Sequence, residues 1–249
     1  MNIIVNAKIT RNDEIAHKIY KICLELPAEY PYPEPGQFVN IYLNDNSRLL
    51  PRPISICDWE GNTLTLVYAV VGDGTKILST YQCGAGIRVS SPLGNGFSIE
   101  GIGRYMLISG GVGTPPMLFL AKKLMAAGCD IRAVLGFRSE PFLADEFPCT
   151  VGIATDDGSC GFKGNAIQLL MQTDIPDGTT LLSCGPRPML RALAQFAAAR
   201  GLPLQVSLEE RMGCGYGACV ACVCKTEGGN RKVCEDGPVF NASEVVWYE

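Results

Sequence analysis

Four cysteines near the C-terminus have the spacing of ligands for an iron–sulfur cluster. Cys214, Cys219 and Cys222 form a C-x4-C-x2-C run, and Cys234 follows after eleven further residues, as in plant-type [2Fe–2S] proteins. Glycines between the first cysteines leave room for the backbone to fold tightly and to direct N–H groups at sulfur. Such a cluster transfers one electron at a time, so the motif predicts an electron carrier.

A structural zinc site is the alternative for the same cysteines. Zinc also accepts four thiolates, but it usually binds two short C-x2–4-C pairs, whereas here three cysteines share one loop and the fourth stands alone. The spacing therefore favours the cluster. Cys224 is a rival ligand, because it follows Cys222 by two residues. Val223 and Lys225 around it predict a strand, and we interpret Cys224 as a buried neighbour of the ligands.

A glycine-rich loop between a predicted strand and a predicted helix reads Gly110-Gly111-Val112-Gly113-Thr114-Pro115-Pro116. Glycines let a backbone approach a diphosphate, and a helix N-terminus offers free N–H groups and the positive end of its dipole. The match to G-x-G-x-x-G is incomplete, because Pro116 takes the place of the third glycine, so a tight turn without a ligand stays open. Its position after a parallel strand favours a nucleotide site.

A second loop, Cys184-Gly185-Pro186-Arg187-Pro188, also joins a strand to a helix and should lie at the same edge of the sheet. Cys184 is either a core thiol or a small polarizable side chain beside a planar ring. Another strand ends near Arg138 and Glu140, where a ribose would bind. Glu140 suits ribose hydroxyls and Arg138 suits a 2′-phosphate, so NAD and NADP both stay open.

Two turn-like motifs in the first hundred residues have groups that suit an anion. In Arg52-Pro53-Ile54-Ser55 an arginine precedes a predicted strand and is followed by a hydroxyl. This pair suits a flavin diphosphate and the edge of the flavin ring. An exposed charge is the commoner fate of an arginine. Gly74-Thr75 begins a short predicted helix and is a second candidate anion site.

The hydrophobic pattern predicts strands over residues 3–10, 18–26, 37–43, 53–57, 63–70 and 87–90, with one short helix over residues 74–82. Six short strands at this spacing predict a six-stranded Greek-key barrel or a sandwich. From residue 103 strands (105–109, 131–137, 151–155, 180–183, 205–208) alternate with helices (117–127, 165–171, 188–199). This alternation predicts a parallel sheet with crossover helices. We therefore divide the chain into a barrel (1–101), an α/β domain (102–210) and a small cysteine-rich domain (211–249).

The composition is that of a globular protein without a nucleic-acid footprint. The 249 residues are 47% hydrophobic and 18% charged, with a net charge of −4. No apolar run is long enough to span a membrane and no signal-peptide pattern is present at the start. The eight cysteines outside the motif suit reduced thiols, which predicts the cytoplasm. His17 is the one histidine, and we expect it on the surface of a strand, so His-based hydrolysis is a poor fit.

Taken in order, these motifs resemble the ferredoxin reductase flavoprotein superfamily and, within it, the electron-transfer subunits of dihydroorotate dehydrogenase B, over essentially the full length. The resemblance implies FAD on the barrel at Arg52, Pro53, Ile54, Ser55, Val67, Tyr68, Ala69, Gly74 and Thr75. It implies NAD at Gly110, Gly111, Gly113, Thr114, Pro115, Cys184, Gly185 and Pro186. It implies a [2Fe–2S] cluster on Cys214, Cys219, Cys222 and Cys234.

The resemblance also implies a partner, a separate FMN-containing catalytic subunit, with two copies of each chain in a heterotetramer. Electrons would pass from dihydroorotate through FMN, the cluster and FAD to NAD⁺ in pyrimidine biosynthesis. No residue set here supplies the base that dihydroorotate oxidation needs, which agrees with that step on the partner. Tyr216 and Val220 in the cysteine-rich loop are candidates for contact with it, or for local packing.

Two other functions stay open. The first is an NAD(P)H–ferredoxin, sulfide dehydrogenase or hydrogenase-associated flavoprotein subunit, which the residues near the ribose position do not separate from the first assignment. The second is a zinc-stabilised, non-enzymatic binding module, which metal analysis and colour would distinguish from an iron–sulfur flavoprotein.

Overall fold

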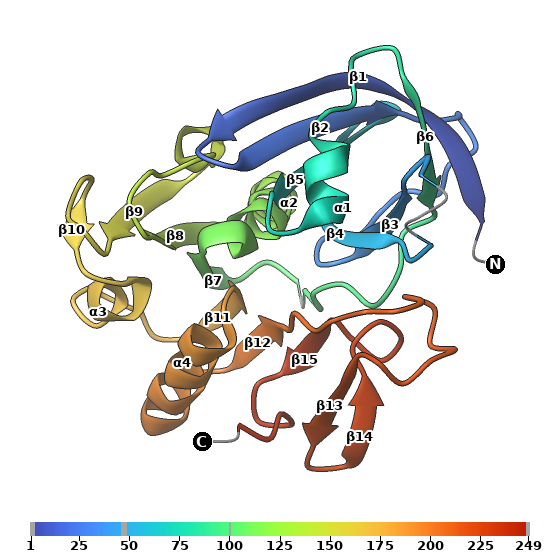
Figure 1. Cartoon of the computed structure of the whole chain (residues 1–249). Coiled ribbons are helices and arrows are strands. Elements are labelled where there is room, and N and C mark those ends of the chain that lie inside the picture. The colour runs from blue at the N-terminus through green and yellow to red at the C-terminus, as the bar shows by residue number, and fades with distance from the viewer. Residues whose placement is uncertain (1–2, 46–48, 100, 248–249) are drawn as a thin grey trace.

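The computed structural model describes residues 3–45, 49–99 and 101–247 and contains a closed barrel, a seven-stranded sheet and a two-stranded sheet (Figure 1). Residues 1–2, 46–48, 100 and 248–249, which belong to the predicted first and third domains, lie outside the described residues. None of the helices in the described ranges has the length and hydropathy that a membrane span requires.

The barrel is antiparallel and closed, in the strand order β1-β2-β5-β4-β3-β6. Alternate apolar residues point inward along each strand, so that Ile22 and Leu24 on β2 face Leu64 and Leu66 on β5 in a fully buried core. The predicted six-stranded barrel is confirmed. Its elements are β1 (Ile4–Ala16), β2 (Ile19–Glu25), β3 (Phe38–Tyr42), β4 (Arg52–Glu60), β5 (Thr63–Ala69), α1 (Asp73–Leu78) and β6 (Gly86–Ser90).

The first strand is longer than the sequence predicts. β1 continues past residue 10 to Ala16, with register shifts against β2 at Ile9/Arg11 and at Glu14/Ala16. The polar run from Arg11 to Glu14 has no apolar alternation, so the pattern hides this part of the strand, in which Glu14 lies opposite Tyr20 of β2 and accepts a hydrogen bond from its hydroxyl at 3.3 Å. His17 is exposed as predicted, but it lies in the turn between β1 and β2 and not on a strand.

The larger sheet has the order β10-β9-β8-β7-β11-β12-β15, and every pair is parallel except β12 with β15. Its strands are β7 (Arg104–Gly110), β8 (Asp130–Phe137), β9 (Thr150–Thr155), β10 (Phe162–Lys163), β11 (Thr179–Cys184), β12 (Leu204–Ser207) and β15 (Val239–Asn241). Helices α3 (Ala166–Leu170) and α4 (Arg187–Arg200) pack on Met106 and Ile108, whereas α2 (Thr114–Ala126) packs on Leu107 and the opposite face. The predicted α/β layer is confirmed.

Two local predictions about the helices are also confirmed. Pro115 and Pro116 lie in the first turn of α2, where an N–H has no intrahelical partner. Gly201 ends α4 with a φ of +64°, a left-handed conformation that glycine adopts without strain.

The cysteine-rich tail adds both a hairpin and a sheet strand. β13 (Val223–Thr226) and β14 (Gly229–Lys232) form the two-stranded sheet, and the strand predicted around Val223 and Lys225 is thereby confirmed. β15, which the sequence pattern does not predict, pairs antiparallel with β12. Cys222 and Cys234 of the tail share a core with Phe38 of the barrel and with α4. The tail is therefore packed against both larger parts, and the domain boundaries stay a prediction.

Candidate cofactor-binding sites

A cavity of about 450 Å³ lies where the barrel meets the larger sheet and the tail. We call it the barrel cleft. It brings together every residue of the predicted flavin set except Gly74, namely Arg52, Pro53, Ile54, Ser55, Val67, Tyr68, Ala69 and Thr75. Residues that the sequence did not single out complete its wall: Phe38, Val71, Val112, Ser207, Leu208, Glu209, Glu210, Met212 and Pro238. The run after β12 was recognisable only from its place at the carboxyl end of a parallel strand.

Gly74 supports the cleft from behind, through its contact with Arg52. A Cβ at Gly74 would lie 1.8 Å from Arg52 Nε, so glycine alone leaves space for the guanidinium there. Arg52 Nη1 donates to the carbonyls of Leu50 and Pro51 at 2.7 and 3.2 Å. Thr75 Oγ1 accepts the N–H of Val71 at 3.0 Å. The arrangement holds a permanent cation at the cleft wall, which suits an anionic phosphate.

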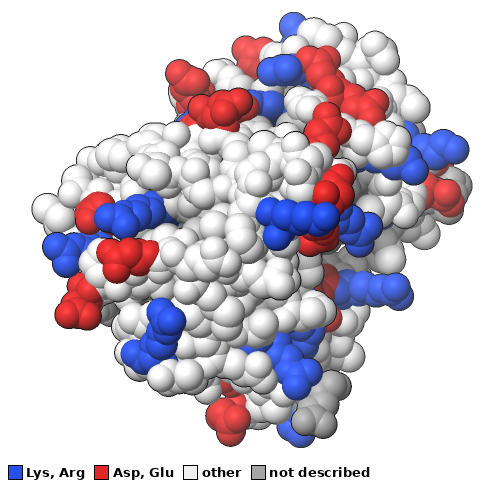
Figure 2. Space-filling view, turned by 90° about the vertical axis from the view of Figure 1, so that its left-hand side faces the viewer, with Lys and Arg blue, Asp and Glu red and all other residues white. Residues whose placement is uncertain are grey.

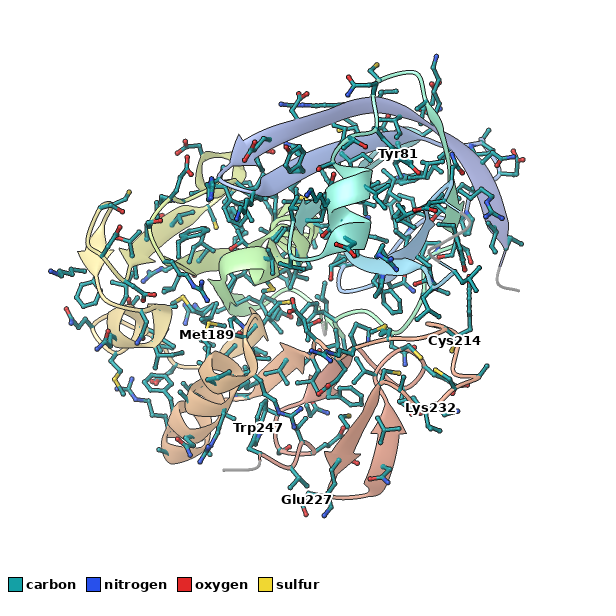
Figure 3. All side chains as sticks on the ribbon, viewed as in Figure 1. Tyr81, Met189, Cys214, Glu227, Lys232 and Trp247 are labelled. Atoms are coloured by element: carbon teal, nitrogen blue, oxygen red, sulfur yellow. The ribbon has the colours of Figure 1, made fainter. Side chains whose placement is uncertain are left out.

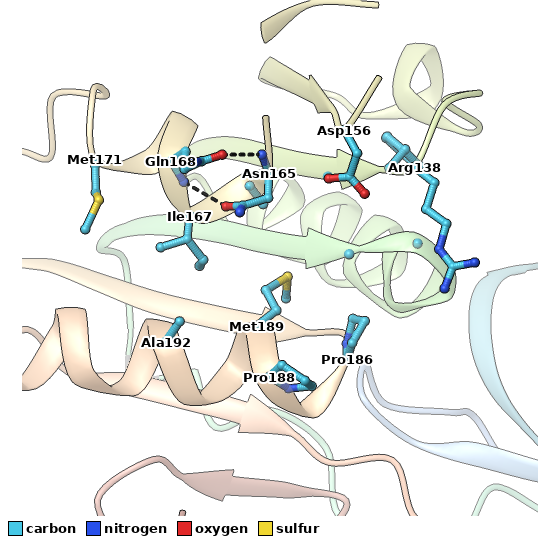
Figure 4. Close-up of a pocket in the computed structure, with 15 residues that line it drawn as sticks. Arg138, Asp156, Asn165, Ile167, Gln168, Met171, Pro186, Pro188, Met189 and Ala192 are labelled. Carbon is cyan, nitrogen blue, oxygen red and sulfur yellow. Dashed lines mark hydrogen bonds between the residues drawn. The ribbon is translucent and has the colours of Figure 1, made fainter. Parts of the chain in front are cut away.

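A second cavity, of about 580 Å³, opens at the carboxyl ends of β7 and β8, and we call it the sheet pocket. Figure 4 shows Arg138 and Asp156 on one side of it, with Pro186, Pro188 and Met189 across from them. Gln168 and Asn165 close another side through two hydrogen bonds, from Asn165 N–H to Gln168 Oε1 at 2.9 Å and from Gln168 N–H to Asn165 Oδ1 at 3.0 Å (Figure 4). Of the predicted nucleotide residues, Gly110, Gly111 and Pro186 line the pocket.

The other predicted nucleotide residues lie behind this lining, where the two loops pack together. A Cβ on Gly113 would lie 2.2 Å from the carbonyl oxygen of Cys184, and one on Gly185 would lie 3.0 Å from the N–H nitrogen of Gly110. Thr114 and Pro115 are buried at the start of α2. Glycine at these positions therefore lets the two loops touch, whereas Gly111 has a φ of +52° and faces open space.

Cys184 is fully buried between the two loops, and burial raises the pKa of its thiol far above the ordinary value. It belongs to the core that includes Leu107 and Leu182, and it does not line either cavity. Of the two alternatives for Cys184, the structure thus shows the core thiol. Its place beside a nicotinamide ring stays a prediction.

The carboxylate in the sheet pocket is not the one that the sequence singled out. Glu140 Oε2 accepts the backbone N–H of His17 at 3.0 Å and lies outside the pocket lining, whereas Asp156 lines the pocket together with Arg138. Asp156 directly follows β9, so its position at a strand end was the available signal. The structure therefore places Asp156, and not Glu140, at the sheet pocket.

The cysteine loop, residues 213–222, contains Cys214, which Figure 3 labels, and directs backbone N–H groups at sulfur. Tyr216 and Cys219 each donate to Cys214 Sγ at 3.4 Å, and Gly217 donates to Cys234 Sγ at 3.2 Å. Burial alone would raise the pKa of Cys214, but these donors lower it to about 7. The loop thus favours a thiolate at Cys214, the form that binds metal.

The four predicted ligands are free thiols and are gathered in part. Cys222 Sγ lies 3.2 Å from Cys234 Sγ, and both residues are buried, whereas Cys214 and Cys219 are half-buried. In the ranges that the structure describes, no group of three or more His, Cys, Asp or Glu side chains is arranged to hold a metal ion. The ligand set therefore stays a prediction that rests on the spacing and on the N–H donors.

Neighbouring side chains hold this loop in place. Lys232 Nζ donates to the carbonyl of Gly217 at 2.5 Å and pairs with Glu235 at 3.1 Å. Cys224 is buried, as interpreted from the sequence. The hydroxyl of Tyr216 contacts that of Tyr42 in the barrel, whereas Val220 is 75% exposed. Val220 is thus the better placed of the two for contact with another protein.

Known proteins resemble this chain over nearly its whole length. Residues 209–246 match the model of the iron–sulfur cluster binding domain of dihydroorotate dehydrogenase B. The dihydroorotate dehydrogenase B (NAD⁺) electron transfer subunit of Bacillus caldolyticus is 41% identical over 93% of this chain and 94% of its own length. The corresponding protein of Clostridium perfringens is 39% identical over 96% of both chains.

The chain belongs to the family of dihydroorotate dehydrogenase B electron transfer subunits.

Solved structures place this family member in the ferredoxin reductase fold. A structure of NADH-dependent reduced ferredoxin–NADP oxidoreductase, from a study of flavin-based electron bifurcation, superposes with a TM-score of 0.87 at 32% identity and covers 97% of this chain and 90% of its own. The ferredoxin NADP⁺ reductase of Neisseria gonorrhoeae with bound FAD and NADP has a TM-score of 0.65 at 16% identity, over 80% of this chain and 92% of its own, and shows the shared fold alone.

The residues of the two cavities and the cysteine loop fit the groups that the family implies. The barrel cleft has a guanidinium beside a glycine whose Cβ would displace it, the sheet pocket has glycine backbone at a strand end, and the cysteine loop has N–H donors at sulfur. Figure 3 separates Met189 at the sheet pocket from Cys214 in the cysteine loop, and the barrel cleft contains Met212, two residues before Cys214. The cleft therefore adjoins the cysteine loop.

Proposed function

We propose that this chain is the electron transfer subunit of a dihydroorotate-oxidising enzyme and passes electrons from a catalytic partner to NAD⁺ in pyrimidine biosynthesis. The observation that carries the proposal is the wall of the barrel cleft. The predicted flavin residues of β4 and β5 share that wall with Met212, which directly precedes the cysteine loop. One junction thus adjoins both the predicted flavin residues and the predicted cluster ligands.

The chain's residues would bind and orient three groups. Arg52 would pair with the FAD diphosphate, with Pro53, Ile54, Ser55, Val67, Tyr68, Ala69, Gly74 and Thr75 around the flavin. Gly110, Gly111 and Pro186 would take the nicotinamide nucleotide, with Gly113, Thr114, Pro115, Cys184 and Gly185 behind them. Cys214, Cys219, Cys222 and Cys234 would bind a [2Fe–2S] cluster. A flavin exchanges two electrons with a nicotinamide and single electrons with a cluster, which is chemistry that the cofactors supply.

The partner would be an FMN-containing catalytic subunit, in a heterotetramer of two plus two. Val220 on the cysteine loop supports a contact there, because a large apolar side chain is 75% exposed beside the predicted ligands. Figure 2 shows acidic and basic side chains interspersed on the face that it presents, without a patch of one sign that would suit nucleic acid. We place the enzyme in the cytoplasm, with the barrel, α/β and cluster domains at 1–101, 102–210 and 211–249.

Coexpression with the catalytic subunit from the same genome tests this function. The expected result is a coloured complex that contains FAD, FMN and iron and reduces NAD⁺ when dihydroorotate is added. A complex that forms but does not reduce NAD⁺, or a colourless chain that contains zinc after anaerobic purification, would contradict the proposal.

A matched pair of cysteine variants tests the ligand set. Cys234→Ser should lose iron and cluster-dependent electron transfer, whereas Cys224→Ser, which changes an equally buried neighbour, should keep both. Both variants should retain FAD, because neither residue lines the barrel cleft. Loss of iron from the Cys224 variant would contradict the proposed ligand set, in which Cys222 and not its rival Cys224 is the third ligand.

The 32% identity and TM-score of 0.87 to NADH-dependent reduced ferredoxin–NADP oxidoreductase favour one alternative function, electron exchange between a pyridine nucleotide and ferredoxin. That function predicts reduction of ferredoxin by the isolated holoprotein and no complex with the dihydroorotate-oxidising chain. Steady-state assays with ferredoxin and pull-down with the catalytic subunit separate the two.

A further inference from the structure

One face of β3 runs from the barrel cleft to the cysteine loop. Side chains alternate along a strand, so Phe38, Asn40 and Tyr42 point to the same side. Phe38 lines the cleft, Asn40 contacts Cys214, and the hydroxyl of Tyr42 contacts that of Tyr216. This strand therefore contacts both the predicted flavin site and the predicted cluster site.

Asn40 makes the central contact of this face. Its side chain is fully buried, and Nδ2 donates to the carbonyl oxygen of Cys214 at 2.9 Å. A Cβ on Gly215 would lie 2.5 Å from the same nitrogen, and Gly215 has a φ of +75°. The backbone N–H of Asn40 donates to Ser90 Oγ at 2.9 Å. The amide is thus held by the barrel and pressed against the first two residues of the cluster motif.

Asn40 also neighbours β4, which carries predicted flavin residues and which we call the flavin strand. In the β3–β4 ladder Asn40 lies opposite Pro53, which lines the barrel cleft. Asn40 Oδ1 is buried and has no hydrogen-bond partner among the described residues. A buried acceptor without a donor is unfavourable, so packing alone does not explain an amide at this position. The hydrogen bond that Asn40 Nδ2 donates to the Cys214 carbonyl explains the amide.

We propose that Asn40 is a positioning residue that fixes the cysteine loop relative to the flavin strand and thereby sets the rate of electron transfer between flavin and cluster. The inference rests on the proposed function, and it assigns Asn40 no contact with either group. Loss of a side chain that orients a metal ligand typically costs about 10–100-fold in affinity or activity. An effect of that size is expected on the flavin-to-cluster step alone.

The test uses the full-length chain loaded with FAD and cluster, mixed with NADH under anaerobic conditions. Flavin bleaching and cluster reduction are followed separately in a stopped-flow instrument. Asn40→Asp puts an acceptor against the Cys214 carbonyl, and Asn40→Leu removes the hydrogen bond with little change of size. In both variants flavin reduction should keep the wild-type rate, and cluster reduction should be about 10–100-fold slower. Asn40→Asp should also lower the cluster reduction potential, because it adds negative charge nearby.

The control is Asn62→Asp, which removes another barrel amide that donates to a backbone carbonyl, here that of Leu26 at 3.3 Å, away from the cysteine loop. It should leave both steps unchanged. Wild-type cluster reduction in both Asn40 variants with full iron content would overturn the inference. Loss of iron from both variants with flavin retained would also overturn it, because Asn40 would then serve loop folding alone. A wild-type chain without flavin and iron would instead contradict the proposed function.

Discussion

The barrel cleft and the sheet pocket are built in different ways. The sheet pocket is formed by successive strand–loop–helix units of one sheet, in which β7, β8 and β11 each end beside it. The barrel cleft takes its wall from β4 and β5, from the run that follows β12, and from Pro238 in the tail. The sheet pocket thus depends on one sheet, whereas the barrel cleft exists only when three parts of the chain are packed together.

This difference matches what each cavity would bind. A group held between packed segments adds its binding free energy to their association, so it is retained as a resident cofactor. A pocket at the edge of one sheet needs no rearrangement of the other parts and suits a ligand that exchanges. Changes in the sheet pocket should therefore act on its own loops, whereas changes in the barrel cleft should act on cofactor retention.

The largest effect is expected where the two loops of the sheet pocket touch. In Gly113→Ala the new methyl group would lie 2.2 Å from the Cys184 carbonyl oxygen, and backbone cannot move aside as a side chain can. We expect the free energy of unfolding to fall by about 3 kcal/mol and the melting temperature by several degrees. Thermal unfolding by circular dichroism measures this.

Gly86→Ala is the matched control for this change, because a Cβ at Gly86 meets no atom within 4 Å. Its melting temperature should stay close to that of the wild type. An equal melting temperature for Gly113→Ala would show that the loops can separate, and the sheet pocket would then be as adaptable as the barrel cleft.

The same contrast explains which features the sequence predicts. The six barrel strands and the two glycine loops are encoded locally, by alternation and by glycine at turns, and they appear where expected. β15 has three residues and exists only because β12 offers it an edge. Phe38 and the run after β12 come to the cleft, and Asn40 comes to the cysteine loop, by tertiary packing. No periodicity in the sequence could place them there.

Gly74→Ala tests retention in the barrel cleft. The added Cβ would lie 1.8 Å from Arg52 Nε, and because a guanidinium is mobile, the chain should fold with Arg52 displaced. Loss of a hydrogen bond to a charged group costs about 1.5–3 kcal/mol, so the Kd for FAD should rise about 10–100-fold. Fluorescence titration of the apoprotein measures the Kd.

The neighbouring change Gly72→Ala is the control, since Gly72 has an extended backbone and a Cβ there meets no atom within 4 Å. Its affinity for FAD should match that of the wild type. Unchanged FAD affinity in Gly74→Ala would remove Arg52 from the proposed flavin site.

A smaller effect is expected from Asp156→Ser in the sheet pocket. Asp156 would repel the 2′-phosphate of NADP, and Arg138 beside it would remain to bind that phosphate. The ratio of kcat/KM for NADPH to that for NADH should rise about tenfold, which corresponds to about 1.4 kcal/mol. FAD content should not change, because Asp156 lies outside the barrel cleft.

Asp157→Asn controls for charge alone, since the Asp157 carboxylate accepts the N–H of Ser159 at 2.9 Å and does not line the pocket. It should leave the nucleotide preference unchanged. Equal shifts in the two variants would mean that overall charge, and not the position of Asp156, sets the preference.

The smallest effect concerns a junction contact outside the barrel cleft. Lys122 on α2 pairs with Asp58 on β4 and joins the sheet layer to the barrel, with the Lys122 side chain 40% exposed. Lys122→Met should therefore lower the free energy of unfolding by about 1 kcal/mol or less and leave the Kd for FAD unchanged. A loss of FAD affinity would show that this contact between barrel and sheet, although outside the barrel cleft, also supports it.

The pH dependence of that small difference has a definite sign. Burial lowers the pKa of Lys122, but the hydrogen bond and charge of Asp58 raise it by more than burial lowers it. The net pKa therefore lies above its ordinary value. A pKa raised by folding contributes stability below the pKa of the unfolded chain, about 10.4, and that contribution is lost as pH rises through the folded value. Urea unfolding should show the full difference between wild type and Lys122→Met at pH 8 and a smaller one at about pH 11. An unchanged difference at the higher pH would mean that the lysine stem packs against the barrel and the ion pair contributes nothing.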